Sequence, residues 1–372
     1  MIEKYYDGAI EQVAAGLGTV EKNHLLVRYS GQFSVENLND TKQLEKNEDI
    51  FVQVHEFETG EITCAYEPYL TMICDGFRRY MTGTFEEFME TCDVYYLHRP
   101  VLLGYFNQDN TGREEIILLD EVAYEQERML AALERMLCAI ADRHPVLFVL
   151  NRFQLASKST MQLTARFLKC ENCNIGLVLG VSDIQAMPEF LVPDWEMLYE
   201  TLDDGSKIYH IGNSGRKKEE TIDDEKYVDY GSEKVYRKLQ NMVEFLDFDQ
   251  AAYYLETIER KIKFDNLLVD DAARFRMWLL FVKVSILRQD IPKALEICED
   301  LEKIHLAGKE EECAYEQDYL IATAYMYQGK LKEALEMAGE TYRIAGKMSD
   351  DYRMFLSELL EAKIQMSGWY NI

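Results

Sequence analysis

Hydrophobic and polar positions follow two alternating patterns along the first 212 residues. Four apolar runs have the length of a β-strand, and three of them are apolar enough to be buried on both faces of a sheet. These runs span residues 24–30, 49–57, 145–151 and 174–183. Between them lie segments whose apolar residues recur every three or four positions, as in amphipathic helices. These segments span residues 68–81, 123–144 and 159–172. The alternation predicts a three-layer α/β domain with a mainly parallel sheet.

From residue 235 onward only the helical pattern is found. Three similar segments, at 245–258, 286–301 and 326–341, each have a small residue near the start of their second helix. These residues are Ala251, Ala294 and Ala334, at steps of 43 and 40, and a fourth turn is expected at Gly368, 39 residues after Gly329. Regular steps of this size predict repeated helical hairpins, and the pattern resembles tetratricopeptide repeats (TPR) with longer loops. Ordinary bundling of amphipathic helices is the alternative.

A hydrophilic segment separates the two patterns. Residues 213–234 contain glycine and many charges and have no apolar face at either period, which is typical of a linker. We therefore expect an α/β domain at 1–212, a linker at 213–234 and an all-α TPR-like repeat domain at 235–372. Charge also differs across this boundary, because the chain up to Gly215 has 35 acidic and 17 basic residues, against 32 and 23 after it.

The composition narrows the class of protein. The formal net charge is −27, which disfavours a direct nucleic-acid or anionic-membrane partner because both require a cationic face. No apolar run approaches the roughly 20 residues that span a bilayer. Eight cysteines in 372 residues form no dense disulfide framework, and the acidic N-terminal stretch does not resemble a signal peptide. We expect a cytoplasmic protein with reduced thiols and no membrane association.

The segment at 145–183 resembles part of the STAND-class ATPases, which are AAA+-like P-loop proteins. Four apolar residues of the VLFVL run lead to a strand end, a short loop and a helix, as in the Walker B to sensor 1 portion of that class. The segment at 48–81 is similar to the second strand of the class and the helix after it. Helical repeats often follow the ATPase domain in such proteins. The resemblance implies a P-loop-like fold for the α/β domain.

The residues required for ATP hydrolysis are missing from both halves of the implied site. Catalysis needs a glycine-rich loop with a lysine and a hydroxyl residue. In the register of that loop, Gly31 stands at the first glycine position. Glu36, Asn37 and Leu38 stand where the second glycine, the lysine and the hydroxyl residue are required. At the end of the Walker B-like strand, where two acids are required, Asn151 and Arg152 stand instead. These losses predict a pseudo-ATPase that is not an enzyme and binds no cofactor.

Other chemistry has weaker support. Cys170 and Cys173 have a spacing that suits one side of a zinc site or a redox pair, but no second pair accompanies them, so we expect reduced thiols and no metal site. The six histidines are scattered, and no serine or cysteine lies in a nucleophile motif.

The predicted function is that of a non-catalytic, regulatory scaffold for protein interaction and signalling, which binds a protein or peptide through its helical repeats. The candidate anchors are Arg274, Arg276, Trp278, Tyr315, Tyr319 and Arg353, although the aromatic ones equally suit the core between repeats. A nucleotide-binding switch of the STAND class with an unusual site, or a fragment of a larger transcription or signalling regulator, are the alternatives. Self-association through the apolar face of the final helix remains open.

Overall fold

A computed structural model describes ten stretches of the chain. They comprise residues 2–18, 24–29, 49–58, 61–108, 122–170, 174–182, 187–203, 207–211, 229–265 and 267–369. The chain divides into two compact units, the first formed by residues 1–228 and 244–247, the second by residues 229–243 and 248–372. The second unit thus begins inside the range expected for the linker.

The first unit contains a five-stranded sheet in the order β2-β3-β4-β1-β5, and every neighbouring pair is parallel. The strands are β1 (His24–Tyr29), β2 (Phe51–Glu56), β3 (Val146–Asn151), β4 (Ile175–Val181) and β5 (Lys207–Ile211). The first four fall on the apolar runs in the sequence, so the expected parallel sheet is confirmed. The short strand β5 was not expected. Strands β3 and β4 are buried along their whole length, as their continuous apolar runs predict.

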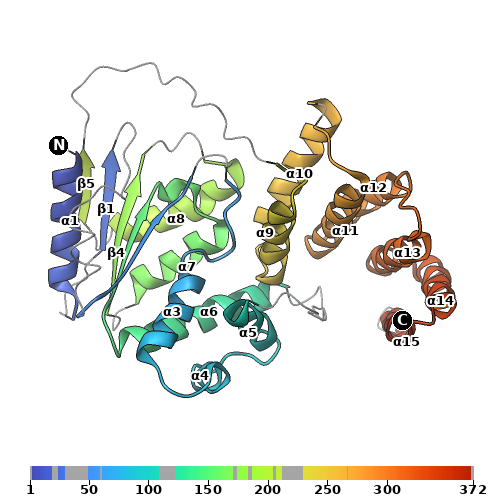
Figure 1. Ribbon diagram of the computed structural model, residues 1–372, viewed down its shortest axis with the longest axis horizontal. Coiled ribbons are helices and arrows are strands. Elements are labelled where there is room, and N and C mark those ends of the chain that lie inside the picture. The colour runs from blue at the N-terminus through green and yellow to red at the C-terminus, as the bar shows by residue number, and fades with distance from the viewer. Residues whose placement is uncertain are drawn as a thin grey trace. The chain divides into compact units, whose positions relative to one another are not determined.

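Helices cover both faces of the sheet (Figure 1). They are α1 (Ile2–Gly16), α3 (Tyr69–Tyr80), α6 (Val122–Ala141), α7 (Lys158–Lys169) and α8 (Val192–Asp203). Two further helices, α4 (Phe85–Thr91) and α5 (Arg99–Asn107), pack beside α3 through rings that contact Phe77. Ile10 and Val13 of α1 pack on one face, against alternate residues of the central strands such as Val149. On the other face the ring of Tyr69 in α3 lies 4.7 Å from that of Phe148 in β3. Successive side chains of β3 point to opposite faces of the sheet, so this strand contributes to the hydrophobic core on each face.

The second unit is all-helical, as expected. Its helices are α9 (Glu233–Glu244), α10 (Phe248–Phe264), α11 (Asp271–Leu287), α12 (Ile291–Leu301), α13 (Glu310–Tyr327), α14 (Leu331–Met348) and α15 (Asp351–Trp369). Consecutive helices from α10 onward contact each other, and α13 also contacts α11 and α15, so the helices form a stack (Figure 1). Ala251, Ala294 and Ala334 lie in the first turns of α10, α12 and α14 and are fully buried. Small residues there let neighbouring helices approach closely.

The turns of the helical unit agree only partly with the expected pattern. Gly329 has a φ of 79° between α13 and α14, a left-handed conformation that glycine adopts without strain. The fourth turn expected at Gly368 is wrong, because Gly368 lies inside α15. Good helix formers such as Glu361, Ala362 and Lys363 continue α15 towards this position, so the helix runs for 19 residues to Trp369.

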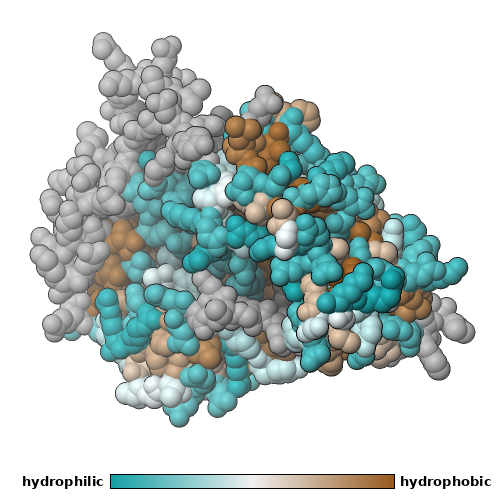
Figure 2. All heavy atoms as spheres, turned by 45° about the vertical axis from the view of Figure 1, so that its right-hand side comes forward, coloured by the Kyte–Doolittle hydropathy of each residue, from teal (hydrophilic) through white to brown (hydrophobic). Residues whose placement is uncertain are grey.

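The surface agrees with the acidic composition. Figure 2 shows one face of the molecule, on which hydrophilic residues predominate and hydrophobic residues form separate patches. Within the described ranges, no helix combines the length and the apolar character needed to cross a membrane.

Candidate functional site

The end of β3 is the position where the sequence resemblance implies catalytic acids. Asn151, its last residue, is fully buried, and its carbonyl oxygen accepts a hydrogen bond from the backbone N–H of Phe57 at 3.1 Å. Arg152 follows in a left-handed conformation, with φ 52° and ψ 42°. Its Nε lies 3.5 Å from Oε1 of Glu56, the last residue of β2. A neutral amide and an ion-paired guanidinium thus occupy this strand end, and neither can act as a general base.

The other half of the implied nucleotide site lies outside the described residues. This half comprises Gly31, Glu36, Asn37 and Leu38, in the segment after β1.

A buried polar network links the ends of β3 and β4. Gln154, only 3% exposed, donates from Nε2 to Ser182 Oγ at 2.8 Å, and its Oε1 accepts from the backbone N–H of Ser182 at 3.3 Å. Ser182 directly follows β4. Two bonds from one side chain to one residue fix the distance between the two strand ends. Buried polar groups satisfied in this way make the region rigid.

The first turn of α7 is closed by side chains of the protein. Ser157, fully buried, is the N-cap and accepts from the N–H of Thr160 at 3.3 Å. The carboxylate of Asp247, 4% exposed, accepts from the N–H of Ser159 at 3.0 Å, and Ser159 Oγ in turn accepts from the N–H of Tyr66. A carboxylate at a helix N-terminus is stabilised by the helix dipole. Burial and Asp247 together raise the pKa of Tyr66.

Sequence reasoning missed Asp247 because it lies almost ninety positions from α7. It belongs to residues 244–247, which are grouped with the first unit although α9 and α10 belong to the second. Phe245, fully buried, places its ring 6.2 Å from that of Tyr66, and Gln126 donates to the carbonyl of Leu246 at 2.6 Å. In the sequence, this segment is marked only by the run FLDFD at 245–249, in which two phenylalanines lie beside two aspartates.

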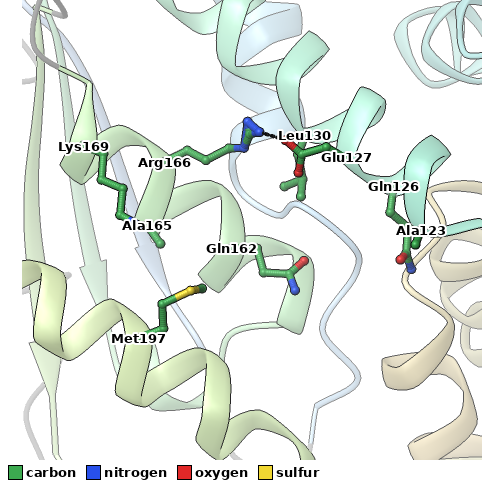
Figure 3. A pocket seen from close by; sticks show the side chains of 9 residues that line it. All are labelled: Ala123, Gln126, Glu127, Leu130, Gln162, Ala165, Arg166, Lys169 and Met197. Atoms are coloured by element: carbon green, nitrogen blue, oxygen red, sulfur yellow. Dashed lines mark hydrogen bonds and ion pairs between the residues drawn. The ribbon is translucent and has the colours of Figure 1, made fainter.

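A cavity of about 280 Å³ lies between α6, α7 and α8 (Figure 3). Its lining residues are Ala123, Gln126, Glu127, Leu130, Gln162, Ala165, Arg166, Lys169 and Met197. Arg166 pairs with Glu127 and, at 3.1 Å, with Glu134, while Gln162 donates to Asp194 at 2.9 Å. Because these polar groups are already paired, the cavity offers a ligand few uncompensated charges.

The candidate aromatic anchors of the helical unit are mostly part of its core. Trp278 is 3% exposed and Tyr315 is 2% exposed. Tyr315 donates from its hydroxyl to the carbonyl of Arg353 at 3.0 Å, which ties α13 to α15. Both rings are too deeply buried in the helical unit to contact a partner protein. Tyr319 is half-buried and stacks on Tyr315 with ring centroids 6.0 Å apart.

The three candidate arginines form ion pairs within the unit. Arg274 pairs with Asp271 at 2.8 Å, and Arg276 pairs with Glu233 at 2.8 Å. Arg353 pairs with Glu316 at 2.8 Å and lies over the ring of Tyr315. A ligand would have to compete with these carboxylates for each arginine.

A group of tyrosines on α13 and α15 forms a partly exposed surface that sequence reasoning identified only in part. We call Tyr319, Tyr327 and Tyr352 the tyrosine face. The last two are 36% and 46% exposed. Burial raises the pKa of Tyr319 to about 12, and the neighbouring Tyr315 and Tyr352 act in the same direction. Tyrosines offer large contact area at low conformational cost.

Of the two cysteines with the Cys170 and Cys173 spacing, Cys173 lies outside the described residues. The sulfur of Cys170 lies 3.9 Å from that of Cys138 in α6. Across the stretches that the structure describes, no three His, Cys, Asp or Glu side chains gather as a metal site.

Comparisons with known proteins add no family to this description. No protein-family model matches the chain, and no curated protein matches it significantly.

Proposed function

We propose that this protein is a non-catalytic interaction scaffold. Its α/β unit is of the P-loop ATPase type but does not hydrolyse ATP, and its helical unit, built of TPR-like hairpins, binds a protein or peptide partner. The observation that carries the proposal is the end of β3, where Asn151 is fully buried and Arg152 is paired with Glu56.

Two features of the α/β unit support this assignment. The segments that resemble the STAND class correspond to β2, β3, α7 and β4, in the same chain order, and β3 and β4 are neighbours inside a parallel sheet. In parallel sheets, ligands bind beyond the carboxyl ends of the strands. At the carboxyl end of β3 the protein has a buried amide in place of an acid. Hydrolysis requires positioned charge at that point, so the missing acid removes the group that activates water in sites of this type.

The helical unit supports the second part of the proposal. Stacked helical hairpins present a long surface that suits extended or helical ligands. The tyrosine face supplies aromatic contact area on two helices of the stack. The chain carries a formal net charge of −27, so a basic protein or peptide segment is the electrostatically complementary partner.

Capture of partners by point variants tests this function. The bait is the full chain, in an extract of the cells that produce it, as wild type, as Tyr319→Ala/Tyr327→Ala, and as Arg152→Ala. The matched control is Tyr342→Ala on α14, whose side chain is 37% exposed. The double variant should lose the partners, whereas Arg152→Ala and Tyr342→Ala should retain them. Loss of the same partners by Arg152→Ala would show that the strand end is in use and that the scaffold proposal is wrong.

A further inference from the structure

The final helix, α15, has two apolar faces. The first packs inside the helical unit, where Leu360 and Ile364 are almost fully buried against Ala334 and Ala338 of α14. Met354 packs nearby, and Ser357, only 1% exposed, donates to the carbonyl of Arg353. This inner face packs α15 against α14 in the stack.

A second row of apolar residues on α15 lies outside these buried clusters. It consists of Tyr352, Phe355, Leu359, Ala362 and Met366, at successive spacings of three, four, three and four residues. Phe355 is 57% exposed and Met366 is 59% exposed. We call these five residues the outer seam. A 3-4 spacing is that of positions a and d in a coiled coil, where each side chain inserts between residues of a facing helix.

Heptad lettering separates the two faces of α15 cleanly. With Tyr352 at position a, the buried residues Met354, Ser357, Leu360 and Ile364 take positions c, f, b and f. These positions lie on the side opposite a coiled-coil contact. The outer seam can therefore receive a second helix while the inner face stays packed on α14.

The charges beside the outer seam indicate which helix fits. In the same lettering Glu358 takes position g and Lys363 takes position e, five residues later. In a parallel pair of identical helices, position g of one lies next to the following e of the other, so Glu358 would face Lys363 twice by symmetry. In an antiparallel pair, position g meets position g and position e meets position e, so Glu358 would not face Lys363. The charges thus complement a second copy of the same helix in parallel orientation.

We propose that the outer seam is a self-association surface, through which α15 pairs in parallel with α15 of a second copy of the chain. Apart from Tyr352, which also belongs to the tyrosine face, this inference rests on residues that the proposed function does not use. The seam spans residues 352–366, just over two heptads and so fewer than the three to four of a sustained coiled coil, and each chain carries a net charge of −27. We therefore expect a weak dimer, with a dissociation constant on the order of 10 μM.

Sedimentation equilibrium of the full chain over a concentration series tests the seam. Measurement at about 150 mM salt limits the repulsion between the acidic chains, because the Debye length is then only about 8 Å. The wild type should dimerise. Phe355→Glu and Met366→Glu should each weaken the dimer by about tenfold or more. The matched control is Leu268→Glu, since Leu268 is 95% exposed, lies between α10 and α11, and receives the same charge. A monomeric wild type at 100 μM, or a dimer unchanged in both seam variants, would overturn the proposal.

Charge exchange tests the orientation. Glu358→Lys alone and Lys363→Glu alone should each weaken the dimer about three- to tenfold, because each places like charges opposite one another. Mixing these two variants, or combining both changes in one chain, should restore the wild-type affinity. In an antiparallel pair the single changes would leave the affinity unaltered, so that result would also overturn the proposal. Circular dichroism of each variant checks that its helix content is unchanged.

Discussion

The Nε atom of Arg152 lies 3.5 Å from Oε1 of Glu56 and so connects the residue after β3 to the last residue of β2. These side chains are 26% and 19% exposed, so the pair is partly shielded from solvent. A guanidinium held in this way neutralises the carboxylate of the neighbouring strand. Together with the buried amide of Asn151, it leaves this strand end without a free carboxylate in the positions that the resemblance assigns to catalysis.

Restoring an acid at Asn151 should destabilise the protein. The side chain is fully buried, so burial would raise the pKa of the new carboxyl above its unfolded value. Such a group costs no stability while it is protonated in both states, but above about pH 4 the unfolded state ionises preferentially and stability falls as pH rises. At pH 8 we expect Asn151→Asp to unfold more easily than wild type by about 2–3 kcal/mol. Urea unfolding at pH 4 and pH 8 measures this difference, and a pH-independent difference would contradict the burial argument.

Removal of the Asp247 carboxylate should also destabilise the fold. Its Oδ2 accepts from the backbone N–H of Ser159 at 3.0 Å, at a buried helix start. Asp247→Ala leaves this N–H without its acceptor, which should cost about 2–3 kcal/mol, while Asp247→Asn keeps an acceptor oxygen and should cost about half as much. Thermal unfolding of the full chain compares the two variants. Equal losses would show that the charge, and not the hydrogen bond, provides the stability.

Lys283 should limit stability at neutral pH. Burial lowers its pKa to about 8, against a smaller opposing effect from Glu316. Because the folded pKa lies below the unfolded value near 10.5, the unfolding free energy rises as pH increases from 8 towards 10.5. Lys283→Met should therefore stabilise the protein by about 1–2 kcal/mol at pH 7, with a smaller gain at pH 10. Lys332→Met on α14 is the exposed control and should have little effect at either pH.

His98 should make the protein sensitive to acid. Burial, followed by the charge of Arg128, lowers the pKa of His98 to about 4, although its Nε2 lies 2.9 Å from the carboxylate of Glu125. A folded pKa below the unfolded value near 6.5 supplies stability above pH 6.5 that is lost as pH falls towards 4. His98→Gln should remove up to about 3 kcal/mol of this pH dependence. The exposed His305 provides the control substitution His305→Gln, and equal pH profiles for both variants would refute the prediction.

Local patterns predict much of this fold. Continuous apolar runs identify β3 and β4, because strands buried on both faces need apolar side chains at every position. The small residues Ala294 and Ala334 identify the close approach of helices in the stack. Strand β5 was missed because the run KIYHI is only five residues long and mixes polar with apolar residues, so it lacks the continuous apolar character of the other strands.

The site could be predicted less completely, since its decisive contacts join residues far apart in sequence. Asn151 and Arg152 are adjacent to a recognisable strand, but nothing local relates Arg152 to Glu56 or Asp247 to Ser159. Trp278 and Tyr315 appeared as anchors by residue type alone, and burial in the helical core decides their role. Conversely, the exposed positions of Phe355 and Met366 become informative only when the inner face of α15 is known.

The most direct test of a non-catalytic α/β unit is the rate of ATP hydrolysis by the purified full chain with Mg²⁺. Our account predicts no turnover above a buffer control, because the implied loop lacks its lysine and hydroxyl and the end of β3 carries Asn151 and Arg152. Turnover above the control that disappears in Asn151→Ala or Arg152→Ala would contradict it.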